Sequence, residues 1–380
     1  MKNNWQLVEF EECLNSIPRY TKIPKKEFLE KGQYPIISQE KDLVNGYWDN
    51  EDDIFKIQKP VVIFGDHTKI VKYIDFDFAV GADGVKIFEP KKEINTRFFA
   101  FALQNIKLDD LGYARHYRLL KESKIPIPPL SEQQAIVKKL NAAFELIDHA
   151  KANIEKNIQN AKELFQSKLN EVFSQKGDGW EERKLDEVTI IKGRIGYRGY
   201  TKEDLVNKGE GAITLSPSNI VNNRFHTNNC TYISWFKYEE SPEIMVFDGD
   251  ILFVKTGSTY GKVAIVENLS EKATINPQFV VLKNIKINNK FLFYSLTTKI
   301  FKEKVESIVG GTATPTLSQT NLGNLTIYHP NLETQQEIVA QLDELSAKTE
   351  QLQQKYQQKL ANLEELRKSI LEKAFKGELV

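Results

Sequence analysis

The sequence predicts an α+β protein with two α/β domains that are related by approximate twofold pseudosymmetry and separated by two long helices forming an antiparallel coiled coil. Three observations support this fold class. The chain repeats itself at an interval of 202 positions, two segments without glycine or proline carry apolar residues at helical spacing, and short β-type runs fill the regions before them. A repeat of this length indicates two copies of one module.

The repeat is clearest at the start of the two helical segments. Five residues of the first copy recur in the second: Gln133, Gln134, Ile136, Val137 and Leu140 match Gln335, Gln336, Ile338, Val339 and Leu342. Each copy follows a globular region that opens on a tryptophan, Trp5 or Trp180. A protein with two copies of one module is suited to a target that also presents two sites.

The repeat divides the chain into four segments. We expect a first domain at 1–129, a long helix at 130–176, a second domain at 177–329 and a second long helix at 330–380. The domains contain β-type runs punctuated by Gly, Asp and Asn, which predict strands starting near Tyr34, Pro60, Ile70, Phe78, Val85, Ile251, Val263 and Phe279.

Both long helices have recognisable starts and a shared seam. Ser131-x-x-Gln134 and Thr334-x-x-Glu337 each fit a capping box and follow a proline. Steps of three and four residues repeat along both segments, in the second at Leu342, Leu345, Thr349, Leu352, Tyr356, Lys359, Leu363, Leu366 and Ile370. This spacing is typical of a left-handed coiled coil. Two independent helices, each lying on its own domain, are the alternative, but such helices extend roughly 60 Å at 1.5 Å per residue, which exceeds the face of one domain.

The composition is that of an ordinary globular protein. Hydrophobic residues make up 41% and charged residues 27% of the 380 residues. No apolar run approaches the roughly 20 residues of a membrane span, and the N-terminus lacks the apolar stretch of a secretory signal. Two isolated cysteines suggest reduced thiols, so we expect a cytoplasmic protein. The net charge of zero argues against purely electrostatic binding of nucleic acid.

The sequence contains no motif for catalysis or cofactor binding. A phosphate-binding P-loop, a dinucleotide-binding glycine turn and a zinc-spaced Cys/His cluster are all missing, so we expect no catalytic residue, metal or cofactor. Asn276-Pro277-Gln278-Phe279 is similar to the Asn-Pro-Pro-Tyr/Phe motif of adenine methyltransferases, but Gln278 replaces the second proline. We interpret this tetrapeptide as a turn that enters a strand.

Basic and aromatic loops are the candidates for contact with DNA. Arginine and lysine neutralise phosphates, and side-chain amides and guanidinium groups can read base edges. In the second domain the candidates are Arg194, Tyr197, Arg198, Tyr200 and Lys202, and, in a polar turn between two strands, Lys255, Thr256, Ser258, Thr259 and Lys262. In the first domain they are His67, Lys69, Arg115, His116 and Arg118. The alternative for each loop is a solvated surface without a ligand.

The junctions between domains and helices resemble those of a known family. Pro126-Ile-Pro-Pro-Leu-Ser-Glu-Gln-Gln-Ala-Ile-Val and Tyr328-His-Pro-Asn-Leu-Glu-Thr-Gln-Gln-Glu-Ile-Val are similar to the domain-to-helix junctions of the specificity subunit of type I restriction-modification systems. Gly249–Val266 resembles the central strand-turn-strand of that family, and Gly311–Leu322 its polar stretch before the final strand. The resemblance covers nearly the full length.

The resemblance implies a non-catalytic DNA-binding subunit. Its two target-recognition domains would each read one half of a bipartite site in double-stranded DNA, with the coiled coil setting the distance between halves. Two modification subunits would bring S-adenosylmethionine and the methyltransferase site, and restriction subunits would add ATP- and Mg²⁺-dependent translocation and cleavage. An apolar strip on the helices would dock modification subunits, with Phe144, Leu146, Phe165 and Leu360 as candidates. Packing of these residues against the domains is the alternative.

Two other functional classes remain open. A coiled-coil adaptor would have no direct DNA readout. An autonomous DNA adenine methyltransferase would itself bind S-adenosylmethionine.

Overall fold

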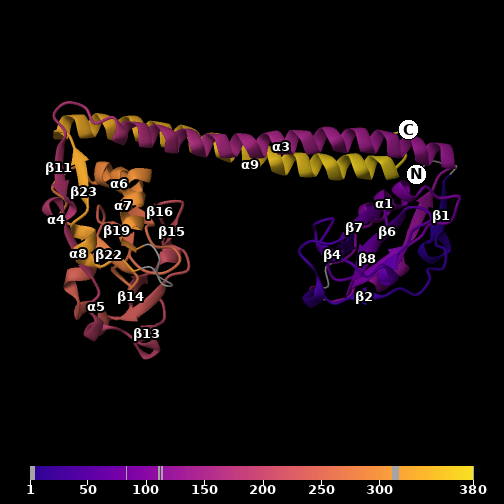
Figure 1. Cartoon of the computed structure of the whole chain (residues 1–380), viewed down its shortest axis with the longest axis horizontal. Helices are drawn as coiled ribbons and strands as arrows, with labels where there is room; N and C mark the ends of the chain where they lie inside the picture. Colours follow the sequence, from indigo (N-terminus) through magenta and orange to yellow (C-terminus); the bar gives the residue numbers. More distant parts are fainter. Residues whose placement is uncertain (1–4, 83, 110–111, 113, 310–315, 380) are drawn as a thin grey trace. The chain divides into compact units, whose positions relative to one another are not determined.

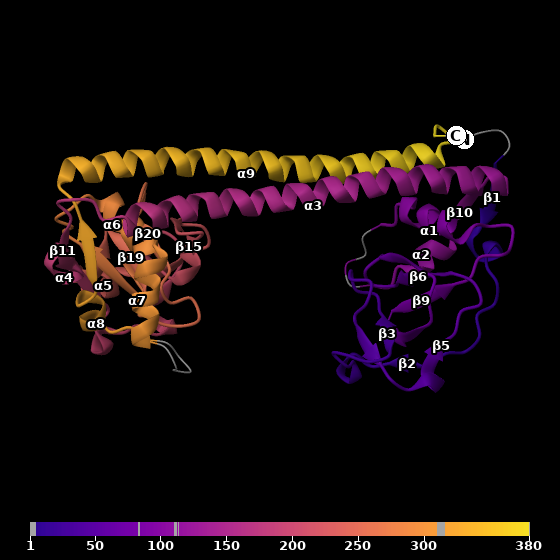
Figure 2. The same ribbon diagram turned by 45° about the horizontal axis from the view of Figure 1, so that its top comes forward.

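The computed structural model describes residues 5–82, 84–109, 112, 114–309 and 316–379 (Figures 1 and 2). The chain folds into two compact units: a first unit of residues 1–156 and 356–380, and a second unit of residues 157–355. Each unit contains a domain of strands and short helices together with parts of both long helices. Among the described residues, no helix has both the length and the apolar character that a bilayer span requires.

The domain of the first unit consists of short strands and two short helices within its described residues. The strands are β1 (Gln6–Glu9), β2 (Lys22–Ile23), β3 (Tyr34–Ile37), β4 (Gly46–Trp48), β5 (Ile54–Phe55), β6 (Val61–Gly65), β7 (Val71–Ile74), β8 (Phe78–Gly81), β9 (Val85–Phe88) and β10 (Lys124–Ile127), and the helices are α1 (Thr96–Asn105) and α2 (Tyr117–Lys121). One sheet has the order β2-β8-β3-β4, with β5 also paired to β8, and another has the order β7-β6-β9. Strand β1 pairs with β10.

Helix α1 covers the β7-β6-β9 sheet and is the centre of the first core. Asn95 caps the helix, because its side chain accepts a hydrogen bond from the amide of Phe98 at 3.0 Å. The run from Phe98 to Leu103 is buried, and Phe98 packs on Phe375 with ring centroids 5.1 Å apart. The core of the first domain therefore continues into the ends of the long helices.

The domain of the second unit repeats this plan with additions. Its strands are β11 (Glu181–Lys184), β12 (Ile190–Gly193), β13 (Leu205–Val206), β14 (Gly211–Leu215), β15 (Ile220–Val221), β16 (Arg224–Phe225), β17 (Thr231–Ser234), β18 (Met245–Val246), β19 (Ile251–Val254), β20 (Val263–Ile265), β21 (Ala273–Ile275), β22 (Phe279–Lys283) and β23 (Thr326–His329). Its helices are α4 (Leu185–Val188), α5 (Trp235–Glu239), α6 (Asn289–Thr297), α7 (Lys299–Val309) and α8 (Gln319–Gly323). The sheets have the orders β12-β22-β19-β20, β13-β17-β14-β21-β18, β11-β23 and β15-β16.

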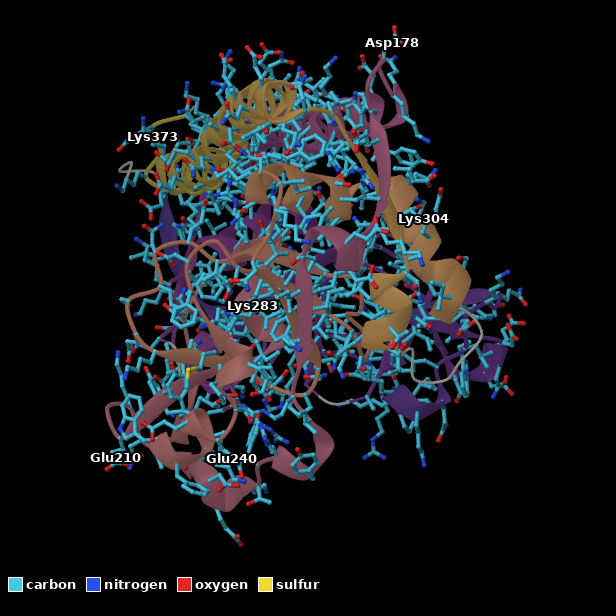
Figure 3. All side chains as sticks on the ribbon, turned by 90° about the vertical axis from the view of Figure 1, so that its left-hand side faces the viewer. Asp178, Glu210, Glu240, Lys283, Lys304 and Lys373 are labelled. Atoms are coloured by element: carbon cyan, nitrogen blue, oxygen red, sulfur yellow. The ribbon has the colours of Figure 1, made fainter. Side chains whose placement is uncertain are left out.

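The β12-β22-β19-β20 sheet is buried on both faces. Alternate residues of a strand point to opposite faces, and in β19 Phe253 joins the cluster formed with α6, α7 and α8, whereas Leu252 joins the cluster formed with β14 and β21. A buried ion pair lies at one end of this sheet, where Lys283 donates to Asp250 at 2.6 Å (Lys283 is labelled in Figure 3). Burial raises the pKa of the Asp250 carboxyl.

The two long helices are α3 (Leu130–Ser174) and α9 (Leu332–Phe375), and they pack together as the sequence predicts. In the first unit they run antiparallel, because Asp148 pairs with Arg367 at 2.7 Å and Lys151 pairs with Glu364. Apolar contacts in that unit join Ile136, Leu140, Phe144 and Ile147 to Leu371, Ala374 and Phe375. In the second unit they join Leu169 and Phe173 to Val339 and Leu342.

Two details of the helix prediction are wrong. Helix α9 is capped by Asn331, whose side chain accepts from the amide of Thr334 at 3.0 Å, so Thr334 lies inside the first turn. Beyond Thr349 the predicted seam is only partly right: Tyr356, Leu363 and Ile370 are half-buried, whereas Leu352 and Leu366 are exposed and Leu360 is half-buried instead.

Candidate nucleic-acid interface

The strand register in the second unit gathers loops that are far apart in the sequence. Gly193, at the end of β12, pairs with Val280 near the start of β22. Phe279, the first residue of β22, pairs with Val254 at the end of β19. The loop after β12, the β19–β20 turn and the loop before β22 therefore emerge at the same edge of the sheet.

A fourth segment joins this edge before α8. Thr316 forms an isolated β-bridge with Thr256, and the amide of Leu317 donates to the carbonyl of Lys255 at 2.8 Å. We call this set of segments the loop edge: residues 194–202, 255–262, 276–278 and 316–319. The sequence-predicted stretch Gly311–Leu322 is only partly visible here, since residues 310–315 lie outside the described part of the chain.

Arg194 holds the first loop in place from the inside. Its side chain is 6% exposed and donates to the carbonyl of Ile275 at 3.1 Å, to the hydroxyl of Thr274 at 3.2 Å and to the carbonyl of Arg198 at 3.3 Å. The guanidinium also lies 5.2 Å from the ring centroid of Tyr200, and burial lowers its pKa. Because these contacts commit the side chain to the interior, we remove Arg194 from the residues that can face DNA.

The other candidates of this loop differ in accessibility. Tyr197 is 80% exposed, and Lys202 is exposed in a 3-10 turn. Arg198 is half-buried and paired with Glu243 at 3.2 Å. Tyr200 is half-buried against the core of the five-stranded sheet. Tyr197 and Lys202 are thus the exposed candidates of this loop, and Arg198 is partly accessible beside its carboxylate partner.

The β19–β20 turn presents a mixture of lysines and hydroxyl groups. Gly257 and Gly261 adopt φ values of +97° and +81°, which residues with a side chain rarely adopt. The amide of Gly261 donates to the carbonyl of Val254 at 2.8 Å and closes the turn. Ser258 is exposed at the tip, and the half-buried candidates are Lys255, Thr256, Thr259 and Lys262.

Asn276 and Gln278 belong to the loop edge, although the sequence pattern predicted no ligand-binding role for them. Asn276 is 8% exposed and its side chain hydrogen bonds both the amide and the side chain of Gln278. The signal in the sequence was the tetrapeptide that we interpreted as a turn. It is a turn, but one whose two amide side chains are arranged as a pair.

The first unit has a smaller version of this edge. Gly65, at the end of β6, pairs with Val85 at the start of β9. The β6–β7 turn therefore matches the β19–β20 turn, as expected from the repeat. It carries His67, which is half-buried and whose amide donates to Gln39 at 3.2 Å, and Lys69, which adopts a φ of +59°.

His116 is a structural residue of the first unit. It is fully buried, its amide donates to the carbonyl of Asp66 at 2.8 Å, and its ring Nδ1 lies 3.0 Å from the same carbonyl. This arrangement fixes the segment carrying Arg115 and Arg118 beside the β6–β7 turn. Arg115 and Arg118 are exposed there, whereas burial removes His116 from the candidates.

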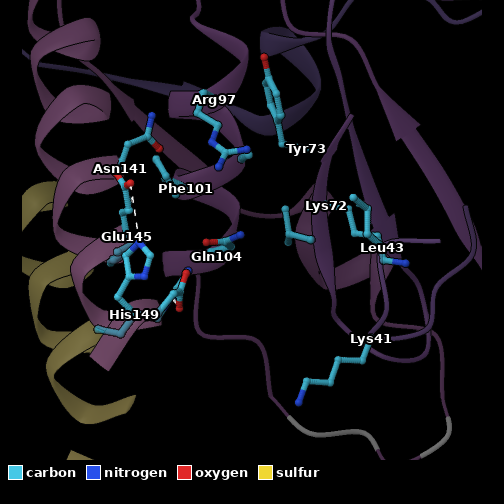
Figure 4. A pocket seen from close by; sticks show the side chains of 15 residues that line it. Lys41, Leu43, Lys72, Tyr73, Arg97, Phe101, Gln104, Asn141, Glu145 and His149 are labelled. Atoms are coloured by element: carbon cyan, nitrogen blue, oxygen red, sulfur yellow. Dashed lines mark hydrogen bonds and ion pairs between the residues drawn. The ribbon is translucent and has the colours of Figure 1, made fainter. Parts of the chain in front are cut away.

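A cavity of about 710 Å³ lies beside α1 in the first unit (Figure 4). Arg97 lines the cavity, and its guanidinium lies 4.6 Å from the ring centroid of Tyr73 and 5.4 Å from that of Phe101. Lys72 also lines the cavity, and burial lowers the pKa of its ammonium group to about 8. Figure 4 also shows Glu145 and His149 paired along α3.

The second unit carries a carboxylate at the corresponding place. Lys290 is the counterpart of Arg97, and it pairs with Asp343 at 2.9 Å. The hydroxyl of Tyr294 donates to the same carboxylate at 2.6 Å. In the first unit the position of Asp343 is taken by Asn141, so the carboxylate is replaced by a neutral amide.

The predicted apolar strip for partner subunits is not formed as a continuous surface. Phe144 is 5% exposed and packs edge-on against Phe101 at 5.5 Å. Phe165 is half-buried with its ring 6.2 Å from Tyr294, and Leu360 is half-buried on the inward stripe. Packing within the chain, which was the alternative, accounts for Phe144 and Phe165. Leu146 is 71% exposed and remains a candidate contact.

The described residues contain no group of three His, Cys, Asp or Glu side chains placed to hold a metal ion. The architecture is that of a duplicated two-domain protein whose units share two long helices. A sequence model described as the type I restriction modification DNA specificity domain matches residues 2–160 and 177–362. The chain belongs to this family, and the resemblance drawn from the sequence is confirmed.

Named relatives agree with this assignment. The chain is 27% identical to the type I restriction enzyme MjaVIII specificity subunit of Methanocaldococcus jannaschii over 65% of this chain and 62% of that protein. It is 25% identical to the EcoBI specificity subunit of Escherichia coli over 69% and 60%, and 23% identical to the EcoKI specificity subunit of Escherichia coli strain K12 over 95% and 85%. The matches to the first two span less than two thirds of their length. All three are named as specificity subunits of type I restriction enzymes.

Solved structures show the same fold. One described as “Structural basis underlying complex assembly and conformational transition of the type I R-M system” superposes with a TM-score of 0.74 over 99% of both chains at 19% identity. The HsdS subunit from Thermoanaerobacter tengcongensis superposes with a TM-score of 0.54 over 99% of this chain and 97% of that one, at 20% identity.

Proposed function

We propose that this chain is the DNA-specificity subunit of a type I restriction-modification complex and that each domain reads one half of a bipartite target. The observation that carries the proposal is the loop edge of the second unit. Strand register gathers two separate basic loops there, and Tyr197, Lys202 and Ser258 are exposed on it. Lysines suit phosphate contacts, whereas tyrosine and serine side chains can reach base edges or sugars.

In this proposal the target-recognition domains are residues 1–129 and 177–329, and the long helices are residues 130–176 and 330–380. The paired helices set the distance between half-sites. Two modification subunits dock on them, and restriction subunits complete the complex. S-adenosylmethionine, ATP and Mg²⁺ bind to those partner subunits. The complex works in the cytoplasm.

Selection from random DNA duplexes tests the proposal. The subunit, assembled with its modification subunits, should enrich two short conserved blocks separated by a spacer of fixed length. Affinity should fall steeply with salt, because phosphate contacts release counterions. An adaptor without DNA readout would enrich no sequence. An autonomous methyltransferase would release heat on binding S-adenosylmethionine as an isolated chain, and we expect none.

Charge removal at the loop edge provides a matched comparison. Lys202→Ala combined with Lys255→Ala should weaken binding and reduce the dependence of log affinity on log salt by about one for each phosphate that is no longer neutralised. Lys286→Ala is the control, since Lys286 is exposed just beyond the other end of β22. Equal effects of the double variant and the control would contradict the placement of DNA at the loop edge.

A further inference from the structure

Asn276 and Gln278 form a pre-arranged pair of amide side chains. Asn276 Oδ1 accepts from the amide of Gln278 at 3.0 Å, and Asn276 Nδ2 donates to Gln278 Oε1 at 3.2 Å. Asn276 is 8% exposed, whereas Gln278 is exposed. A surface glutamine ordinarily loses side-chain entropy when it is ordered by a ligand. Here the buried Asn276 already orders the Gln278 side chain, so less entropy is lost when a ligand binds.

The pair lies in the middle of the loop edge. The carbonyl of Gln278 accepts from the amide of Lys255 at 2.8 Å, which joins it to the β19–β20 turn. Gly257 in that turn leaves room for the amide, since a Cβ there would lie 3.2 Å from Gln278 Nε2. The lysines at either end of the turn, Lys255 and Lys262, are placed to neutralise phosphates beside it.

The hydrogen-bonding capacity of Gln278 is only partly used. Its Oε1 accepts one hydrogen bond from Asn276 and retains a second lone pair. Its Nε2 has no hydrogen-bond partner within the part of the chain that the structure describes. The outward group is thus one donor beside one acceptor. This pair matches N7 and the N6 amino group of adenine in the major groove.

We propose that Gln278 reads an adenine in the half-site bound by the second unit and that Asn276 is the positioning residue that fixes its amide. The inference rests on the proposed DNA-binding function and adds a specificity-determining residue to it. The motif that looks like part of a methyltransferase is, in this fold, a base-reading turn.

The test measures base preference of the subunit assembled with its modification subunits, using duplexes that vary every position of both half-sites. Gln278→Ala should reduce discrimination for adenine at one position of one half-site by about 10-fold to 100-fold. The other half-site is the internal control and should keep its preferences. Thermal unfolding of the variant should match that of the wild-type protein, since Gln278 is exposed.

A second variant separates positioning from mere stability. Asn276→Asp keeps an acceptor for the amide of Gln278 but replaces the donor by an oxygen, which favours a flipped glutamine with Oε1 facing outward. Preference at the same position should then move from adenine towards cytosine, whose N4 amino group is a donor. A structural role alone would change stability and leave the base preference in place.

The outcomes distinguish this inference from the proposed function. Unchanged base preference in Gln278→Ala, or a uniform loss of affinity at all sequences, would overturn the role of Gln278 and leave the specificity subunit intact. A preference for another base at the affected position would overturn the adenine assignment. If the wild-type complex selects no sequence, the proposed function itself fails.

Discussion

Gln133 accepts a hydrogen bond at 2.8 Å from the main-chain amide of Asn95, and Gln335 accepts one of the same length from Asn288. Both asparagines are helix caps, Asn95 for α1 and Asn288 for α6. The Nε2 of each glutamine donates to a proline carbonyl just before its long helix. In both copies of the repeat, a buried glutamine therefore connects the start of a long helix to the cap of a short helix by hydrogen bonds. We call these hydrogen bonds the joint.

Removing this joint should destabilise the unit that contains it. Gln133 and Gln335 are 0% and 2% exposed, so an alanine leaves a buried amide and a buried carbonyl without partners. We expect Gln133→Ala and Gln335→Ala each to lower the free energy of unfolding by about 2–4 kcal/mol. Urea denaturation measures this. The adjacent exposed residues provide the controls Gln134→Ala and Gln336→Ala, and equal losses in variants and controls would contradict the structural role.

Because of Lys72, the free energy of unfolding of the first unit should change with pH in the alkaline range. Burial lowers its pKa from 10.5 to about 8 in the folded protein, so the unfolded chain binds more protons between these values. The cost of burying the charged group is complete below pH 8 and is relieved as the pH rises towards 10.5. Relative to Lys72→Met, the wild-type protein should gain about 2–3 kcal/mol between pH 7 and pH 10. A constant difference in urea denaturation across this range would contradict the lowered pKa.

The elements with clear periodicity were predictable from the sequence, and those defined by burial were not. Both long helices follow from apolar residues at helical spacing, and strand β19 follows from a short apolar run between turn residues. Helix α1 does not, because Phe98–Leu103 are buried on every side and such a run looks alike in a helix and a strand. The loop edge was named residue by residue but not as one surface, since its assembly depends on long-range register. The burial of Arg194 and His116 could not be predicted from the sequence, because tertiary contacts alone decide it.

Asp343 is expected to stabilise the second unit through the buried hydroxyl of Tyr294. Asp343→Asn imitates the first unit and leaves Lys290 and Tyr294 with a weaker, neutral partner. We expect a loss of about 1–2 kcal/mol, and because burial and the carboxylate both raise the pKa of Tyr294, that pKa should fall in the variant. Spectroscopic titration of the tyrosines and urea denaturation check these two effects. Glu344→Gln, on the exposed side of the helix, should have neither effect.

The pairing of Arg198 with Glu243 leads to opposite effects of two substitutions on DNA binding. Arg198→Ala should weaken binding to one half-site and leave the other nearly unchanged. Glu243→Gln releases the arginine from its carboxylate, so affinity for the same half-site should rise and its salt dependence should steepen by about one. Binding to duplexes with one half-site scrambled measures both. If neither substitution alters binding while both alter stability, Arg198 serves only the fold.

The length of the paired helices should set the spacer between half-sites. The Asp148–Arg367 and Lys151–Glu364 pairs place residues 152–155 opposite residues 360–363 in the first unit. Deleting both stretches removes close to one turn from each helix, which rotates the inward faces by only about 40° and shortens the pair by about 6 Å. Since DNA rises about 3.4 Å per base pair, the preferred spacer should shrink by one or two base pairs, and a matched four-residue insertion should lengthen it equally. Selection from duplexes with variable spacers checks both the shorter spacer of the deletion variant and the longer spacer of the insertion variant. An unchanged spacer in the two variants would mean that some other part of the complex fixes the distance.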